Sequence, residues 1–211
     1  MKNNTKKKFE SPASLDSISA TEKALTLNGF LPETVATGAE ALARIKELIP
    51  KEVSVMNGSS RTLEEIGFID YLTNGEHGWN NLHAVILEEK DPTKQMELRK
   101  YSVISDFYLG SVHALAETGE LVIASASGSQ FPHLAFTSPN LILVVGTQKI
   151  VPTIADAHKR IAEYVFPLED ERIKNMGYPG SLIGKEIILH KEHPLMGRKV
   201  HVILVNQKLG F

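Results

Sequence analysis

Apolar residues recur along the chain with two different spacings, which alternate from one segment to the next. Where they lie three or four positions apart, between residues that typically begin or end helices, the spacing predicts an amphipathic helix. The predicted helices cover residues 15–28, 42–49, 62–72, 91–101 and 152–166. The third is expected to begin with a capping box formed by Thr62 and Glu65.

Short runs of consecutive apolar residues predict strands between these helices. The runs cover residues 53–56, 121–124, 141–145 and 200–205, with an extended piece at 31–37 and a further apolar run at 84–87. They are apolar throughout, as in strands that are buried on both faces. The alternation with helices therefore predicts an α/β fold, a mostly parallel Rossmann-like sheet with helices on both faces.

The 211 residues show no repeat and no convincing linker, which favours a single domain over residues 14–211. A smaller lobe at 74–111 is the alternative division. Residues 1–13 are polar and basic, with three consecutive lysines, and predict a disordered tail. No apolar segment follows the lysines, so the pattern is not that of a secretory signal.

Charge and composition narrow the classes of function. With 23 basic and 25 acidic residues the net charge is −2, so no overall field favours nucleic acid or a membrane surface as a partner. No apolar stretch reaches the roughly 20 residues of a spanning helix. The absence of cysteine excludes disulfides and thiolate-bound clusters in this sequence and fits a cytoplasmic protein.

A loop of small and hydroxylated residues follows the predicted strand 53–56. In it, Gly58, Ser59, Ser60 and Thr62 precede a helix, whose free N–H groups and dipole can hold a phosphate or carboxylate. Such loops gather at the ligand-binding edge of an open α/β sheet. The alternative is that these hydroxyls only cap the helix.

A second loop of the same kind follows the strand 121–124. Ser125, Gly128 and Ser129 could form another anion-binding nest, although the lysine and the spacing of a P-loop are missing. The alternative is a flexible connection. His190 and His193 lack zinc-site spacing and an obvious third ligand, so no metal site is predicted.

The segment Glu117-Thr118-Gly119 is a candidate for chemistry, because a carboxylate beside a glycine at the mouth of a strand can face a cleft. In the other interpretation, Glu117 only bonds nearby backbone N–H groups in a turn. Asp106 could be its partner or an ordinary helix cap. Together with the two loops above, Thr118 and Gly119 are predicted to form one anion-binding rim.

Several segments, taken in order, resemble the LUD-domain (lactate-utilisation) family. They are Ala114–Ile123 with its Ala-Glu-Thr-Gly motif, Asn57–Gly67, Phe131-Pro132-His133, Leu141–Val145 and Lys149-Ile150-Val151. The resemblance spans about residues 39–166. The chain departs from the family at Gly180–Glu186, where the family's lactate-utilisation C type has a Thr and an Asp. This difference bears on whether the chain shares the function of that type.

The resemblance implies a fold similar to ribose-phosphate isomerases, glucosamine-phosphate deaminases and CoA transferases. It also implies a role in bacterial lactate oxidation, in which LUD proteins accompany iron–sulfur partner proteins. Without cysteine, this chain would leave the clusters to those partners. The enzymes of similar fold use carboxylates, which would make Glu117 a nucleophile on an acyl-CoA or a proton-transfer group.

Three hypotheses follow for the function. The first is an accessory subunit that binds a small anionic metabolite and carries no cofactor of its own. The second is an independent enzyme, similar to a CoA transferase or a sugar-phosphate isomerase, that uses Glu117. The third is a metabolite sensor without chemistry. CoA or a phosphorylated compound is compatible with each of them.

Overall fold

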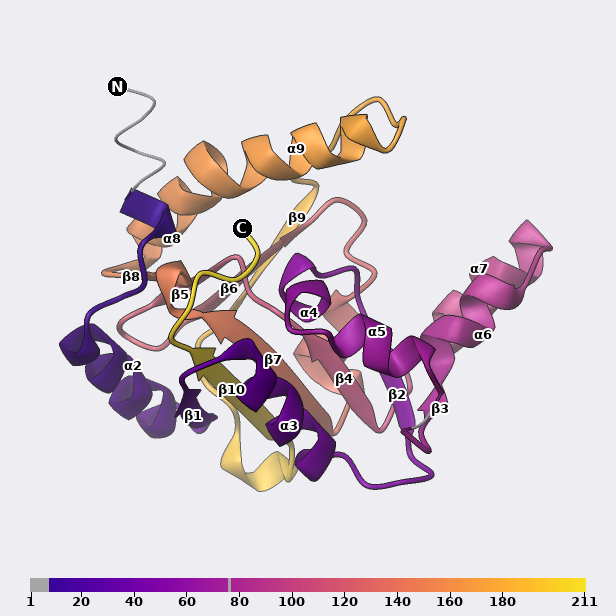
Figure 1. The fold of residues 1–211 in the computed structure, drawn as a ribbon, viewed down its shortest axis with the longest axis horizontal. Helices are drawn as coiled ribbons and strands as arrows, with labels where there is room; N and C mark the ends of the chain where they lie inside the picture. The colour runs from indigo at the N-terminus through magenta and orange to yellow at the C-terminus, as the bar shows by residue number, and fades with distance from the viewer. Residues whose placement is uncertain (1–7, 76) are drawn as a thin grey trace.

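Ten strands form two sheets in the part of the chain described by this computed structural model, residues 8–75 and 77–211 (Figure 1). The larger sheet has six strands in the order β1-β10-β7-β4-β2-β3, and every neighbouring pair is parallel. Its strands are β1 (Leu31–Val35), β2 (Ser54–Asn57), β3 (Asn80–Asn81), β4 (Phe107–Gly110), β7 (Asn140–Gly146) and β10 (Lys199–Val205). The predicted parallel α/β fold is confirmed.

The smaller sheet was not predicted. It has the order β8-β5-β6-β9, in which β6 is antiparallel to both of its neighbours and β8 is parallel to β5. Its strands are β5 (Ala114–Ala116), β6 (Leu121–Ser125), β8 (Ile150–Val151) and β9 (Lys185–Leu189). β6 was expected as a strand, but nothing in its apolar run shows that it leaves the main sheet.

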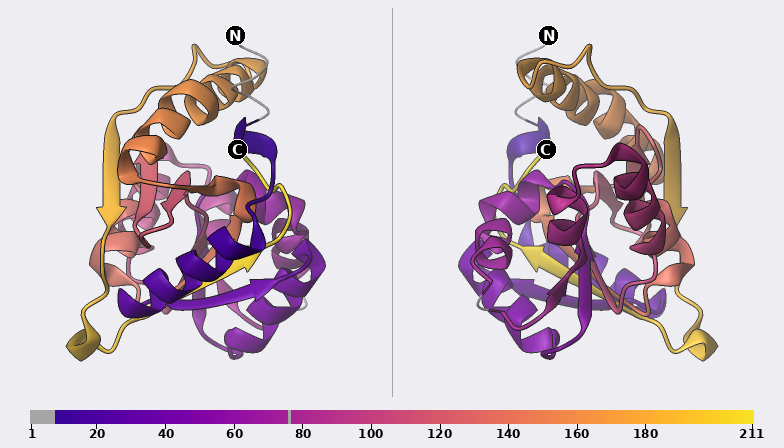
Figure 2. Two further views of the ribbon diagram at one scale, coloured as in Figure 1. Left: turned by 90° about the vertical axis from the view of Figure 1, so that its left-hand side faces the viewer. Right: turned by 90° about the vertical axis from the view of Figure 1, so that its right-hand side faces the viewer.

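Helices surround the two sheets. They are α2 (Leu15–Leu27), α3 (Gly38–Leu48), α4 (Arg61–Glu65), α5 (Phe68–Thr73), α6 (Leu82–Glu88), α7 (Pro92–Tyr101), α8 (Ile154–Arg160) and α9 (Phe166–Asn175), with π-helical turns at His133–Thr137 and Ile161–Val165. Ser14, Thr37 and Asp91 cap α2, α3 and α7 by accepting backbone hydrogen bonds. Figure 2 shows α8 and α9 at the opposite end of the molecule from α3.

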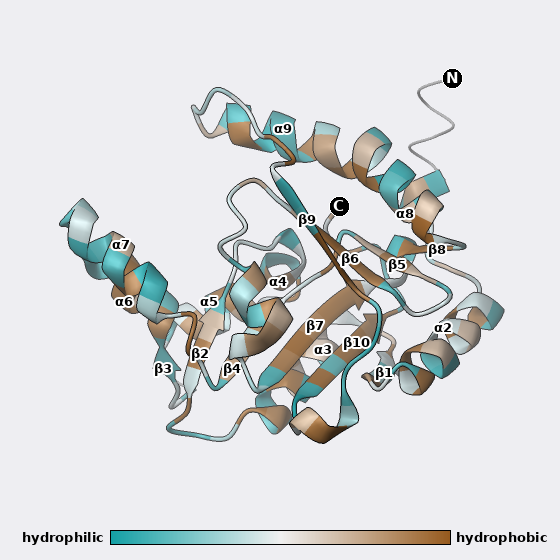
Figure 3. Ribbon diagram, turned by 180° about the vertical axis from the view of Figure 1, so that it is seen from behind, coloured by the Kyte–Doolittle hydropathy of each residue, from teal (hydrophilic) through white to brown (hydrophobic). Residues whose placement is uncertain are grey.

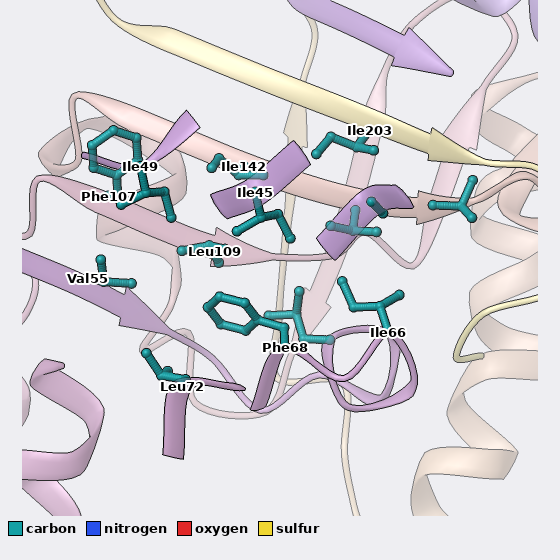
Figure 4. Packing of buried hydrophobic residues seen from close by; sticks show 14 of the residues in the cluster. Ile45, Ile49, Val55, Ile66, Phe68, Leu72, Phe107, Leu109, Ile142 and Ile203 are labelled. Atoms are coloured by element: carbon teal, nitrogen blue, oxygen red, sulfur yellow. The ribbon is translucent and has the colours of Figure 1, made fainter. Parts of the chain in front are cut away.

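The strand β7 separates two hydrophobic cores, because its side chains alternate between the faces of the sheet. Ile142 and Val144 belong to the core under α3, α4 and α5, where they meet Ile45 and Phe68 (Figure 4). Leu143 and its same-face neighbours pack instead against α2 and the smaller sheet. Helices thus cover both faces of the larger sheet, and the smaller sheet covers part of one face. Figure 3 shows β7 and β10 as largely hydrophobic strands between mixed helices.

Two helix predictions and one apolar run differ from the structure. The predicted helix 62–72 is interrupted at Gly67, whose φ of 77° is left-handed and separates α4 from α5. The apolar run 84–87 is part of α6 rather than a strand. The last predicted helix continues past residue 166, because Pro167 lies in the first turn of α9, directly after a π-helical turn that accommodates its missing N–H.

The segment 8–13, assigned to the disordered tail from its composition, packs on the domain instead. Phe9 is 3% exposed and lies against Tyr164 and Arg160, with ring centroids 5.8 Å apart for the aromatic pair. The rest of the predicted tail, residues 1–7, lies outside the described residues.

The segment 74–111 was the alternative smaller lobe. In the structure its helices α6 and α7 extend away from the edge of the larger sheet (Figure 1), whereas its strand β4 lies within that sheet between β7 and β2. No helix in the described ranges is long and apolar enough to cross a membrane.

Candidate functional site

A cavity of about 310 Å³ opens where β2, β4 and β7 end, at the carboxyl edge of the larger sheet. The loops that follow these strands supply one side of the cavity, including Gly58–Thr62, Gly110–His113 and Lys149. The loop after β6, the helical segment 161–173 and residues 181–183 complete the lining. The carboxyl edge of a parallel sheet is where open α/β proteins bind their ligands.

The structure brings both predicted serine-rich loops to this cavity. Gly58, Ser59, Ser60 and Thr62 line it from one loop, and Ser125 and Ser129 line it from the other. A Cβ atom on Gly58 would lie 2.6 Å from the hydroxyl oxygen of Tyr108, so only glycine fits there. Gly128 is not among the lining residues. Its N–H donates to the Ser125 hydroxyl at 2.9 Å and closes the turn.

The helix that follows the first loop cannot hold an anion by its dipole. α4 has only five residues, and its N-cap is Ser60, which accepts from the N–H of Leu63 at 3.3 Å. Thr62 and Glu65 therefore do not form the predicted capping box, because the N-cap lies two positions earlier, at Ser60. Glu65 accepts from the N–H of Gly210 at 2.7 Å instead. In this loop the capping interpretation holds for Ser60.

The side chain of Lys149 supplies the positive charge of the cavity. Lys149 is 3% exposed, and its Nζ donates to the hydroxyls of Thr62 and Ser111 at 2.9 and 3.0 Å and to the carbonyl of Val112 at 3.1 Å. Three acceptors suit the ammonium form, since a neutral amine has only two N–H bonds. Among the described residues, no carboxylate forms an ion pair with it.

A second buried cation lies behind the cavity wall. Arg160 donates to the carbonyl of His113 at 2.5 Å, while its Nε and Nη2 have no hydrogen-bond partner among the described residues. Burial, together with the charge of Arg160, lowers the pKa of Lys149 to about 7, and Glu65 acts weakly in the other direction. Burial also lowers the pKa of Arg160, to about 10.

The other charged residues of the cavity are neutralised by one another. Arg172 binds Glu169 through two hydrogen bonds of 2.7 Å, and Arg61 pairs with Glu64 at 2.9 Å. Glu169 is the one acidic side chain among the described residues that line the cavity. The field inside the cavity is therefore set by Lys149 and by Arg160 behind the wall.

The segment Glu117-Thr118-Gly119 does not reach the cavity, contrary to the predicted single rim. It forms the turn between β5 and β6 and packs against α2, where the hydroxyl of Ser17 donates to Glu117 at 2.5 Å. Asp106 lies apart from Glu117 as well. It accepts from the N–H and hydroxyl of Ser54, at the start of β2, and these bonds lower its pKa. Catalysis by Glu117 stays a prediction, without a cavity around it.

Substitution of Gly119 tests whether this turn serves the fold rather than the cavity. Its φ is 94°, and a Cβ atom there would lie 3.0 Å from the backbone of Ala24 in α2. We expect Gly119→Ala to lower the free energy of unfolding by about 2 kcal/mol, from backbone strain and the clash with α2. Urea unfolding measures this loss. Affinity for an anion in the cavity should stay unchanged, and a selective loss of affinity would contradict the assignment.

His133, in one of the segments that resemble the family, has a structural role. The ring of His133 stacks on Tyr108 with centroids 4.4 Å apart, and its Nδ1 lies 2.9 Å from the hydroxyl of Ser138. Within the described part of the chain, no group of three or more His, Asp or Glu side chains could hold a metal ion.

Lys149 is the site residue that the sequence analysis missed. It appeared only as part of the family resemblance. A signal was present, because Lys149 is a single charge within a strongly apolar stretch from Leu141 to Val151. A lysine in such a stretch is rarely buried without a partner.

The geometry defines a Rossmann-like α/β protein with a cationic cavity at the carboxyl edge of its parallel sheet. The family model for the LUD domain matches residues 18–205, and the chain belongs to that family. It is similar in structure to a DUF162 family protein from Deinococcus radiodurans, with a TM-score of 0.54 and 14% identity over 92% of this chain and 100% of the other. At that identity the likeness concerns the fold alone. No curated protein matches the sequence.

Proposed function

We propose that this protein binds a small anionic metabolite, a carboxylate of the lactate class, in the cavity around Lys149. The observation that carries the proposal is the buried ammonium group of Lys149, which lines the cavity without an ion-pair partner among the described residues. A buried charge without a counter-charge is costly, and a bound anion would offset that cost.

The hydroxyl groups around the cavity support the same ligand class. Ser59, Ser125 and Ser129 line the cavity and can donate to a carboxylate, while Lys149 supplies the compensating charge. A bound anion would also raise the pKa of Lys149 and keep it protonated at neutral pH.

The link to lactate oxidation rests on family membership. We propose that the protein is an accessory, ligand-binding subunit in bacterial 2-hydroxy-acid utilisation. The sequence has no cysteine for an iron–sulfur cluster, so electron transfer would belong to iron–sulfur partner proteins. Purification of the tagged protein from its own cells tests this role. Iron–sulfur proteins should accompany it, and their absence under oxygen-free conditions would count against the accessory role.

An independent enzyme similar to CoA transferases or sugar-phosphate isomerases is the second hypothesis, and it would place the chain in their superfamily. Its predicted residue, Glu117, lies in a turn that packs against α2 rather than in the cavity, and the acidic side chain that lines the cavity, Glu169, is held by Arg172. No observation therefore favours this hypothesis over binding. A sensor would bind the same anion without forming a product.

Replacement of Lys149 by Met tests the anion site. The side chain keeps its length but loses its charge, and a hydrogen bond to a charged group contributes about 1.5–3 kcal/mol. We therefore expect Lys149→Met to weaken the affinity for the best anion at least about tenfold. Isothermal titration calorimetry with lactate, pyruvate and inorganic phosphate measures it.

The matched control is Lys23→Met, which removes an exposed lysine on α2. This variant should bind anions as the unchanged protein does. If both variants bind anions equally well, or if neither these anions nor longer carboxylic acids bind the unchanged protein, the cavity is not the proposed site.

A further inference from the structure

The cavity has two chemically different sides. The strand ends and serine loops form a polar side around Lys149. The second side is mostly apolar and comes from the π-helical turn, from α9, where the paired Glu169 and Arg172 also line the cavity, and from the loop that precedes β9. Its apolar residues are Ile161, Val165, Phe166, Ile173, Leu182 and Ile183.

The apolar side is only partly covered by the protein. Leu182 and Ile183 are 58% and 44% exposed, although both line the cavity. The cavity is also large for a three-carbon acid, because pockets of roughly 300–1,000 Å³ enclose ligands of drug size. Lactate bound at Lys149 would leave this wall in contact with water.

We infer that the ligand is a monocarboxylic acid with an apolar chain or ring, six carbons or longer, rather than lactate itself. Its carboxylate would lie near Lys149, and its apolar part would cover Leu182, Ile183 and the wall of α9. This inference rests on the proposed function, since it assumes an anion at Lys149. It adds the apolar part of the ligand, which the polar side of the cavity does not specify.

Among the charged side chains in the described lining of the cavity, Lys149 is the one cation without an ion-pair partner. Arg172 and Arg61 are already paired with Glu169 and Glu64, which leaves Lys149. A monocarboxylate matches that single charge, whereas a phosphate group carries close to two negative charges at neutral pH. The charge balance therefore favours the carboxylate.

A series of 2-hydroxy acids with the same head and growing chains tests the inference. Calorimetry would compare lactate, 2-hydroxybutanoate, 2-hydroxyhexanoate and 3-phenyllactate, with inorganic phosphate as the competing head group. Burial of each methylene contributes about 0.8 kcal/mol, which corresponds to about fourfold in affinity. We expect the affinity to rise about fourfold per carbon up to six carbons.

Two variants distinguish binding of the ligand's apolar chain from binding of its carboxylate head group. Leu182→Ser should weaken binding of 2-hydroxyhexanoate about tenfold and leave lactate unchanged, whereas Lys149→Met should weaken both acids alike. Leu195→Ser, an exposed leucine that does not line the cavity, is the matched control and should change neither.

The outcomes distinguish the two proposals. If the affinity is the same for all chain lengths, the apolar ligand is wrong while the anion site stands. If phosphate binds more tightly than every acid, the monocarboxylate is wrong. If no compound binds, both the inference and the proposed function are overturned.

Discussion

Acidification from pH 7.5 to 4.5 should remove about 5 kcal/mol from the free energy of unfolding, because two histidines are held neutral in the folded protein. Burial lowers the pKa of His133 to about 4. Burial, with the charges of Lys149 and Arg160 nearby, lowers that of His113 to about 3. An unfolded histidine has a pKa of about 6.5, so the unfolded chain binds more protons in this range.

The direction follows from which state takes up protons. Above pH 6.5 both states are neutral, and the contribution of each histidine is fully present. As the pH falls from 6.5 towards the folded pKa, the unfolded state is stabilised by protonation, at about 1.4 kcal/mol per pH unit and histidine. At pH 4.5 the contribution of each histidine to the free energy of unfolding has fallen by about 2.5 kcal/mol, a large part of the stability of a typical domain.

Replacement of His133 by Phe isolates one of the two contributions. A phenyl ring can keep the stacking on Tyr108, and the hydroxyls of Ser105 and Ser138 still bond each other at 2.9 Å. We expect the loss between pH 7.5 and 4.5 to shrink by about 2.5 kcal/mol in His133→Phe. Urea unfolding followed by the fluorescence of the single tryptophan, the buried Trp79, measures it.

The exposed His190 provides the control, since His190→Gln should keep the acid sensitivity of the unchanged protein. If His133→Phe loses as much stability on acidification as the unchanged protein, then His133 has the same pKa in the folded and the unfolded chain, and burial does not hold it neutral.

The sequence was sufficient for four of the six described strands of the larger sheet and for half of the candidate site, whereas β3 and β4 were not predicted. The loop at Gly58 follows β2 of the larger sheet, and the ends of parallel strands at one edge of a sheet are where open α/β proteins bind ligands. That rule needs no side-chain detail, because it follows from the direction of the chain. Ser129 lies 70 residues further along the chain and reaches the same cavity from the smaller sheet, which this rule does not cover.

The rule does not hold for Glu117 either, because β6 belongs to the smaller sheet and is antiparallel to β5. Glu117 precedes β6 and Ser129 follows it, so the two residues leave opposite ends of one strand. A strand of five residues is about 16 Å long, which separates the two turns. The antiparallel pairing of β5 with β6 then directs the Glu117 turn towards α2.

Lys149 could not be assigned from its neighbours in the sequence. Its three acceptors belong to Thr62, Ser111 and Val112, which lie 37 to 87 positions away along the chain. Only the packing of β2, β4 and β7 side by side brings them together. The sequence predicts where ligands bind in this fold, whereas the charge that would attract them is a tertiary property.

Replacement of Phe9 by Ala should destabilise the protein by about 3 kcal/mol, although the composition of this segment suggested a tail. Phe9 lies in the core formed by the smaller sheet and α8, among Ala157, Ile161 and Tyr164. Truncation of a buried phenylalanine leaves a cavity and usually costs about 3–5 kcal/mol, with the lower value where the chain can close the gap. The control Phe136→Ala removes a ring that is 69% exposed and should change stability by less than about 0.5 kcal/mol.

The consequence reaches the candidate site, because the helical segment that Phe9 supports also forms the apolar wall of the cavity. Ile161 and Val165 contribute both to the core around Phe9 and to the cavity lining. Phe9→Ala should therefore weaken binding of a long-chain acid more than binding of lactate, alongside its loss of stability in urea. If Phe9→Ala is as stable as Phe136→Ala, residues 8–13 do not pack on the domain and do not support the apolar wall of the cavity.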